Sequence, residues 1–137
     1  MVRINHLAVW VAGIAHFMLG AVWYTTLGPA WMAAIAKTET QLRAEQPNVA
    51  IPMIIAVIVA VVIAYTLAWL LPRLEAQSVA GGATAGVMLA ITLIASTLAM
   101  NYGFEVRSIS LWLINSGYMI VGMALMGAII GGWRKKA

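Results

Sequence analysis

Residues 51–71 read IPMIIAVIVAVVIAYTLAWLL, the purest apolar stretch of the chain. A helix rises about 1.5 Å per residue, so about 20 apolar residues cross a hydrocarbon core of about 30 Å. Backbone polar groups in lipid must hydrogen-bond within the segment, which favours a helix. The many Val and Ile residues would suit a strand in water, but the length and the absence of alternating polarity favour a transmembrane helix.

Three further apolar stretches have similar length, at about residues 5–24, 79–102 and 109–133. The 137 residues are 64% hydrophobic and 9% charged, whereas about 25% of residues are charged in a soluble domain. We therefore expect one domain, an all-α integral membrane protein with four transmembrane helices. A signal peptide is the competing interpretation of the first stretch, but its apolar run is too long and lacks a convincing cleavage site.

The connection between the first two spans, about residues 29–46, is too polar to cross the membrane. One helical face of its first half is apolar, with Trp31, Met32, Ile35 and Ala36. We expect this half to form an interfacial helix lying flat on the membrane. Thr38 followed by Gln41 fits a capping box that would start a second short helix. A solvated linker is the alternative for the second half.

The basic residues indicate an orientation. Four spans place both termini and the turn after the second span on one side of the membrane. That side carries Arg3, Arg73, Arg134, Lys135 and Lys136. The other side carries Lys37, Arg43 and Arg107. The excess of basic residues on the terminal side favours termini in the cytoplasm.

Glycines at helical spacing predict close contacts between spans, because small residues let helix backbones approach in lipid. They are Gly13 and Gly20 in the first span, Gly82 and Gly86 in the third, and Gly122, Gly127 and Gly131 in the fourth. The spacing predicts a tight bundle. It leaves open whether the contacts lie within one chain or between chains. The second span is nearly devoid of polar groups, so we expect it to face lipid or a partner.

Polar and aromatic side chains gather where the first, third and fourth spans reach the side opposite the termini. The candidate site residues are His16, Trp23, Tyr24, Asn101, Glu105, Arg107, Asn115 and Tyr118. Polar groups in lipid cost free energy unless they are paired, so this cluster is the candidate functional site. Helical rise places His16, Asn115 and Tyr118 at a similar depth. We expect Arg107 to pair with Glu105.

Two interpretations of this cluster stay open. One is a hydrogen-bonded network that holds three helices together, with contacts worth about 0.6–2 kcal/mol each. The other is a small outward-facing pocket that binds a ligand or passes protons, in which His16 titrates near neutral pH. For the pocket, we expect Glu105→Gln or Asn115→Leu to impair activity more than assembly.

Several chemistries lack a sequence motif. The chain has no cysteine, which excludes disulfides and thiolate sites. We find no HExxH, no GxSxG and no phosphate-binding glycine loop before a lysine. We therefore expect no enzyme activity, no metal and no cofactor. The net charge is +4, but the basic residues form no dense patch of the kind that binds the phosphates of a nucleic acid.

Two classes of function remain after these exclusions. The first is a small-ligand or proton or ion binding or transport protein, which we expect to act as a homo-oligomer because four helices enclose little volume. The second is a structural or accessory subunit docked onto a larger membrane complex. In both, the lipid bilayer is the surrounding partner.

Two stretches of the chain resemble a known family. HLAVWVAGIAHFMLGAVWYTTLGPAW at residues 6–31 is similar to the opening of DUF1761 proteins, although Pro29 lies later than the family pattern has its proline. NYGFEVRSISLWLINSGYMIVGMALMGAIIGGW at residues 101–133 is similar to the closing half, with Asn101, Phe104, Glu105, Arg107, Asn115, Gly117 and Tyr118 in order. The resemblance implies a small bacterial four-span protein of the inner membrane. It implies no activity, because the family is functionally uncharacterised.

Overall fold

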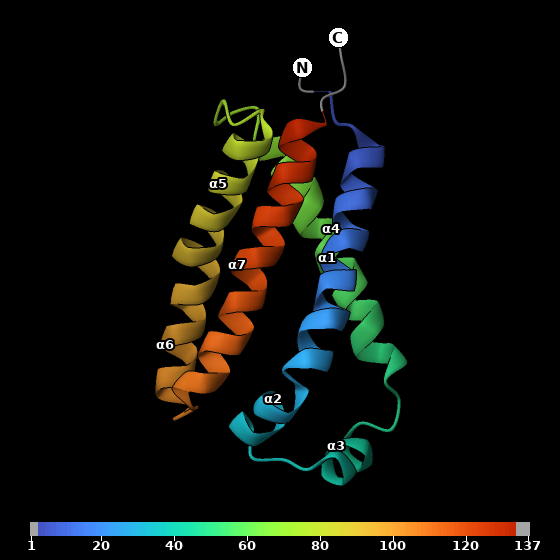
Figure 1. Ribbon diagram of the computed structural model, residues 1–137, viewed down its shortest axis with the longest axis vertical. Helices are drawn as coiled ribbons and strands as arrows, with labels where there is room; N and C mark the ends of the chain where they lie inside the picture. The colour runs from blue at the N-terminus through green and yellow to red at the C-terminus, as the bar shows by residue number, and fades with distance from the viewer. Residues whose placement is uncertain (1–2, 134–137) are drawn as a thin grey trace.

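The computed structural model describes residues 3–133, which form helices joined by turns (Figure 1). Within these residues, four helical segments are long and apolar enough to cross a membrane: α1 (His6–Thr26), α4 (Ala50–Leu70), the continuous segment Val79–Phe104, and α7 (Ile109–Gly132). The predicted all-α architecture with four transmembrane helices is confirmed.

The third span contains a local change of helical geometry that the sequence did not indicate. It consists of α5 (Val79–Leu89), a π-helical turn η1 (Ala90–Ala95) and α6 (Ser96–Phe104). The indole N–H of Trp112 in α7 donates to the carbonyl oxygen of Ala95 at the end of this turn, at 2.8 Å. The π-helical turn is thereby joined to α7.

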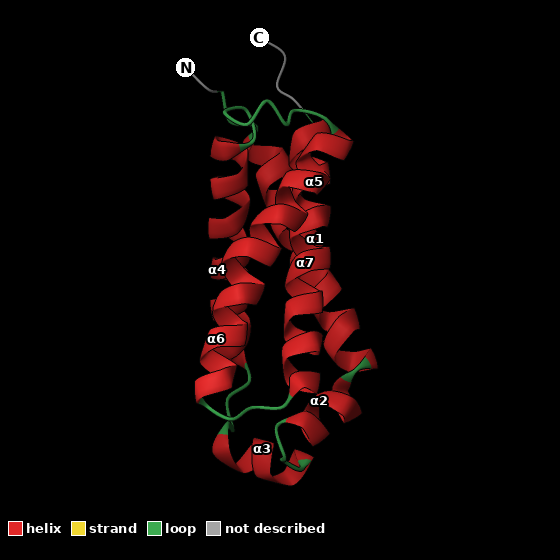
Figure 2. Cartoon of the chain, turned by 90° about the vertical axis from the view of Figure 1, so that its left-hand side faces the viewer, coloured by secondary structure: helices red, strands yellow, loops and turns green. Residues whose placement is uncertain are grey.

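The connection after α1 forms two short helices, α2 (Gly28–Ala34) and α3 (Glu39–Glu45), which lie at the end of the molecule opposite the termini (Figure 2). Pro29 occupies the first turn of α2, where its missing N–H costs no helical hydrogen bond. The Thr38 side chain accepts from the Gln41 backbone N–H, and the Gln41 side chain accepts from the Thr38 N–H. The predicted capping box is confirmed, and the second half of the connection is helical.

The closest helix contact lies between α5 and α7. A Cβ atom on Gly82 would lie 1.9 Å from the carbonyl oxygen of Gly127, and one on Gly127 would lie 2.0 Å from the carbonyl oxygen of Gly82. A Cβ atom on Gly86 would lie 2.1 Å from the carbonyl oxygen of Met123. The glycine faces of these two spans therefore meet within a single chain.

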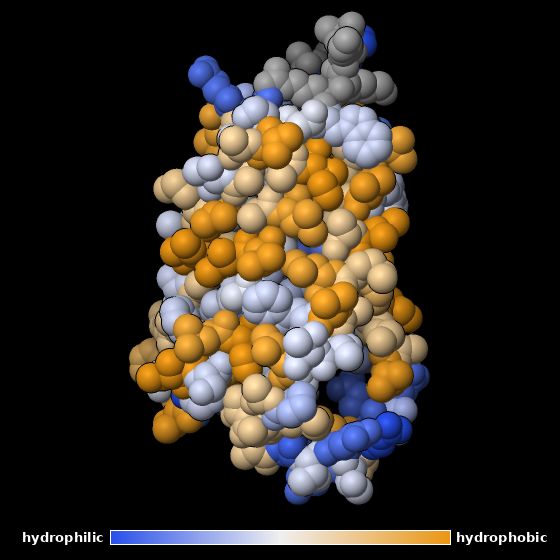
Figure 3. All heavy atoms as spheres, in the orientation of Figure 1, coloured by the Kyte–Doolittle hydropathy of each residue, from blue (hydrophilic) through white to orange (hydrophobic). Residues whose placement is uncertain are grey.

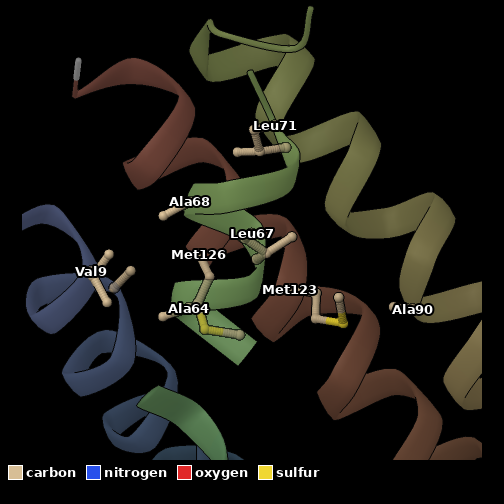
Figure 4. Close-up of a cluster of buried hydrophobic side chains, with 9 residues drawn as sticks. Val9, Ala64, Leu67, Ala68, Leu71, Ala90, Met123 and Met126 are labelled. Atoms are coloured by element: carbon tan, nitrogen blue, oxygen red, sulfur yellow. The ribbon is translucent and has the colours of Figure 1, made fainter. Parts of the chain in front are cut away.

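The two halves of α4 differ in burial: every residue of the first half is exposed, whereas the second half contains buried residues. Its second half packs into the bundle, where Leu67 joins Val9 of α1 and Met126 of α7 in the buried core (Figure 4). Residues 50–59 are all exposed. The expectation that this span faces lipid or a partner was thus wrong for its second half, because Ala60, Ala64 and Ala68 form a small-residue face that lets α4 approach its neighbours.

The surface agrees with a membrane-embedded bundle. Apolar side chains cover the middle of the molecule, and polar ones gather around α3 at one end (Figure 3). The first half of α4 carries exposed Ile54, Ile55 and Ile58. A surface of this kind is stable in contact with lipid.

Candidate functional site

His16 and Tyr118 interlock between α1 and α7. His16 is 3% exposed, and its ring lies in the space left by Gly122: a Cβ atom there would be 2.2 Å from Nδ1. The Tyr118 ring lies against Gly20, where a Cβ atom would be 2.9 Å from the phenolic oxygen. Each helix thus supplies a glycine that makes room for a polar ring of the other.

The phenol of Tyr118 contacts both the ring and the backbone of His16. The phenolic oxygen lies 2.9 Å from Nε2 of His16 and 3.3 Å from the His16 carbonyl oxygen. Nδ1 lies on the other side of the ring, beside Gly122. These contacts hold the imidazole ring between α1 and α7.

A second polar group joins three helices. The Tyr24 hydroxyl of α1 donates to Oδ1 of Asn115 in α7 at 2.8 Å. Nδ2 of Asn115 donates to the hydroxyl oxygen of Tyr102 in α6 at 2.8 Å. Sequence reasoning missed Tyr102, because tyrosine is common at the ends of membrane spans as an interfacial anchor and its position carried no distinct signal.

Trp23 and Tyr24 connect these groups to the packing of the bundle. The Trp23 indole N–H donates to the Ile114 carbonyl oxygen at 3.0 Å. The rings of Tyr24 and Tyr118 meet edge to face, with centroids 5.4 Å apart. No hydrogen bond within residues 3–133 joins the His16–Tyr118 pair to the group of Tyr24, Asn115 and Tyr102. The site therefore holds two hydrogen-bonded groups in ring contact.

A pocket that opens to the surface, called the cavity below, lies beside the second group, between the end of α1, the short helices and α7. Its volume is about 570 Å³ and its lining consists of Tyr24, Gly28, Trp31, Met32, Leu42 and Asn115. Ligand pockets commonly measure about 300–1,000 Å³. In Figure 3 the surface is hollowed near the polar end of the molecule. The sequence had singled out Tyr24 and Asn115 as site residues, whereas Gly28, Met32 and Leu42 were not among its candidates.

Six of the eight sequence candidates lie outside the cavity lining: His16, Trp23, Asn101, Glu105, Arg107 and Tyr118. Glu105 and Arg107 form an ion pair at 3.0 Å, with side chains 52% and 47% exposed, which confirms the predicted pairing. Asn101 is exposed on α6. Successive residues of a helix point about 100° apart, since a turn takes 3.6 residues. Tyr102 can therefore reach Asn115 while its neighbour Asn101 is exposed, so Asn101 does not join the cluster that the sequence predicted.

The described residues also limit metal binding. Within residues 3–133, no three His, Asp or Glu side chains lie close enough together to hold a metal ion. The polar groups of the site are one imidazole, three phenols and one amide. Their chemistry supports hydrogen bonding to a ligand.

Comparison with known proteins gives a family. The family model described as "Protein of unknown function (DUF1761)" matches residues 7–131. The chain belongs to the DUF1761 family. No curated protein and no solved structure matches it. The DUF1761 match includes His16, Tyr118 and the whole cavity lining, and its description states no activity. A role for this DUF1761 protein must therefore be argued from the site itself.

Proposed function

We propose that this protein binds a small molecule in the cavity between α1, α2, α3 and α7. The observation that carries the proposal is the cavity of about 570 Å³, whose mainly apolar lining includes the amide of Asn115, the hydroxyl of Tyr24 and the indole N–H of Trp31. Ligand sites typically combine an apolar wall with a few polar groups that orient the ligand. Asn115 is itself held in place by Tyr24 and Tyr102, so the cavity has a fixed polar end.

Ligand binding has more support than proton transfer. A proton route needs a continuous series of hydrogen bonds. Tyr24 and Tyr118 meet through their rings, and the bonds of the two polar groups do not connect within residues 3–133. The arrangement therefore favours a binding site beside a structural pair, His16 and Tyr118.

The glycines of α5 and α7 do not support docking as an accessory subunit. Gly82, Gly86 and Gly127 contact one another's helices within the chain, so these faces are not available to a partner. The cavity also lies within one chain, so a homo-oligomer is not required for binding.

The proposal includes a location in the bacterial inner membrane with the cavity facing outward. The side of the termini carries five basic residues in the sequence, whereas the opposite side carries three, Lys37, Arg43 and Arg107. Basic residues are enriched on the cytoplasmic side of membrane proteins, which supports cytoplasmic termini.

The test is the thermal unfolding of purified protein with a panel of lipid-soluble small molecules. A ligand present at 100 times its Kd stabilises the folded state by about 2.7 kcal/mol. We expect some compounds to raise the unfolding temperature of the native chain. For compounds that carry a hydrogen-bonding group, Asn115→Leu should lose this shift, while Asn101→Leu, the same change on an exposed position of α6, should keep it. The absence of any saturable shift, or an equal shift by such a compound in both variants, would contradict a ligand site at this cavity.

A further inference from the structure

The charged side chains near the cavity neutralise one another. Lys37 pairs with Glu45, Arg43 pairs with Glu39 at 2.7 Å, and Arg107 pairs with Glu105 at 3.0 Å. These six are all the Lys, Arg, Asp and Glu residues between 25 and 50 and between 100 and 110. None of the residues that line the cavity carries a formal charge at neutral pH. An ionic ligand would meet no partner charge there, and burying an unpaired ion costs several kcal/mol.

The polar end of the cavity has unused hydrogen-bonding capacity. An Asn side chain offers two N–H donors and two lone pairs. Asn115 uses one donor toward Tyr102 and one lone pair toward Tyr24. One donor and one acceptor remain at Asn115, and the Tyr24 oxygen can accept as well. A hydroxyl group both donates and accepts, so it matches this end.

The remaining lining is apolar and adaptable. Trp31 and Met32 come from α2 and Leu42 comes from α3. Thioether and aromatic side chains fit apolar chains of varied shape. Tyr24 and Trp31 lie at the end of α1 and in the following short helix, where aromatic residues mark the membrane interface. A ligand dissolved in the bilayer is therefore already at the level of the cavity.

We propose that the cavity takes an uncharged amphiphile from the bilayer, with a hydroxyl head group at Asn115 and Tyr24 and an apolar chain along Trp31, Met32 and Leu42. This proposal rests on the proposed function, because it names the class of ligand for the same cavity. It also predicts a ranking among probes that share one chain and differ only in the head group.

The experiment uses the full chain in phosphatidylcholine nanodiscs. The probes are brominated forms of dodecanol, dodecanoate, dodecyltrimethylammonium and dodecane, which quench tryptophan fluorescence on contact. The signal from the cavity is the quenching of the native chain minus that of Trp31→Phe, which removes the reporter and keeps an aromatic ring. Titration at two lipid-to-protein ratios identifies the source. Binding from the bilayer follows the mole fraction of probe in lipid, and binding from water follows its aqueous concentration.

We expect saturable quenching by dodecanol that follows its mole fraction in lipid. Dodecane should bind about tenfold more weakly, since it lacks the hydrogen bonds of the hydroxyl group. Both ionic probes should bind more weakly by at least about tenfold. Equal binding of an ionic probe or of dodecane would overturn the ligand class while the binding function survives. Binding that follows aqueous concentration would overturn the bilayer source. If no probe saturates, the proposed function fails as well.

A variant tests the head-group contact. In Asn115→Leu, dodecanol should bind about tenfold more weakly, as dodecane does, because the amide partners are gone. Dodecane binding should be unchanged, which also shows that the cavity is still formed. Asn101→Leu should bind all probes as the native chain does. Dodecanol binding by Asn115→Leu at native strength would overturn the assignment of the hydroxyl to Asn115. If the variant loses its fold, the ranking of probes on the native chain still decides the ligand class.

Discussion

At the scale of single residues, the clearest feature is the fit of an imidazole into a glycine position. We predict that Gly122→Ala destabilises the protein by about 1–3 kcal/mol, the usual cost of overpacking a buried site. The added Cβ atom would lie 2.2 Å from Nδ1 of His16, and the ring is buried. The measurement is the free energy of unfolding in mixed micelles with a denaturing detergent.

The chain offers a matched control for this change. Gly103 is also helical, but nothing lies within 4 Å of a Cβ atom there, so Gly103→Ala should leave the stability unchanged or raise it slightly. His16→Ala should relieve the clash, so its cost should be smaller in the Gly122→Ala chain than in the native chain. Equal stability of the two alanine variants would show that His16 does not occupy the place of the missing Cβ atom.

Most residues of the site could be predicted from the free-energy cost of placing polar groups in lipid. That cost pointed to His16, Asn115 and Tyr118, which the structure places in hydrogen bonds. The same argument included Asn101, because depth along the chain does not specify the direction in which a side chain points. Only the packing of α6 on its neighbours decides that Tyr102 reaches Asn115. That packing depends on contacts between spans, which residue spacing does not contain.

At the scale of elements, α3 is the least supported helix. It has seven residues and none of them is buried, while isolated helices shorter than about 12 residues are marginal in water. Leu42 faces the cavity, and the ion pair of Glu45 with Lys37 is the link to the preceding turn. We predict that backbone amides of α3 exchange with solvent deuterium much faster than those of α7, as measured by mass spectrometry. Equal protection in the two helices would mean that α3 has further support.

Length and composition predicted the spanning elements, because crossing lipid requires about 20 apolar residues in a helix. The capping box likewise revealed the start of α3 at Thr38. The π-helical turn at residues 90–95 had no such marker. The glycines showed which helix faces approach another helix, but not which helix they meet. Partner choice depends on the fit of whole faces, as between Gly82 and Gly127.

At the scale of the whole molecule, the two ends differ in charge, and this asymmetry yields a test of orientation. The chain contains no cysteine, so a single introduced thiol is the sole target for a thiol reagent. Thr40 in α3 and Leu74 after α4 are both exposed and lie at opposite ends of the spans. In intact cells, we predict that a membrane-impermeant reagent labels Thr40→Cys and does not label Leu74→Cys until the membrane is opened. Reversed labelling would contradict cytoplasmic termini.

The position of α7 at the end of the described chain affects the order in which the bundle can assemble. The last helix of the described chain, α7, contacts α1, α2, α4, α5 and α6. During synthesis, the earlier helices enter the membrane before this common neighbour exists. Until α7 arrives, the His16 imidazole has no Tyr118 to bond, and Gly82 and Gly86 face lipid in place of a backbone. Before α7 is made, α1 and α4 can already pack against each other, but the third span has no partner for its glycine face. Completion of α7 therefore joins the third span to the other helices.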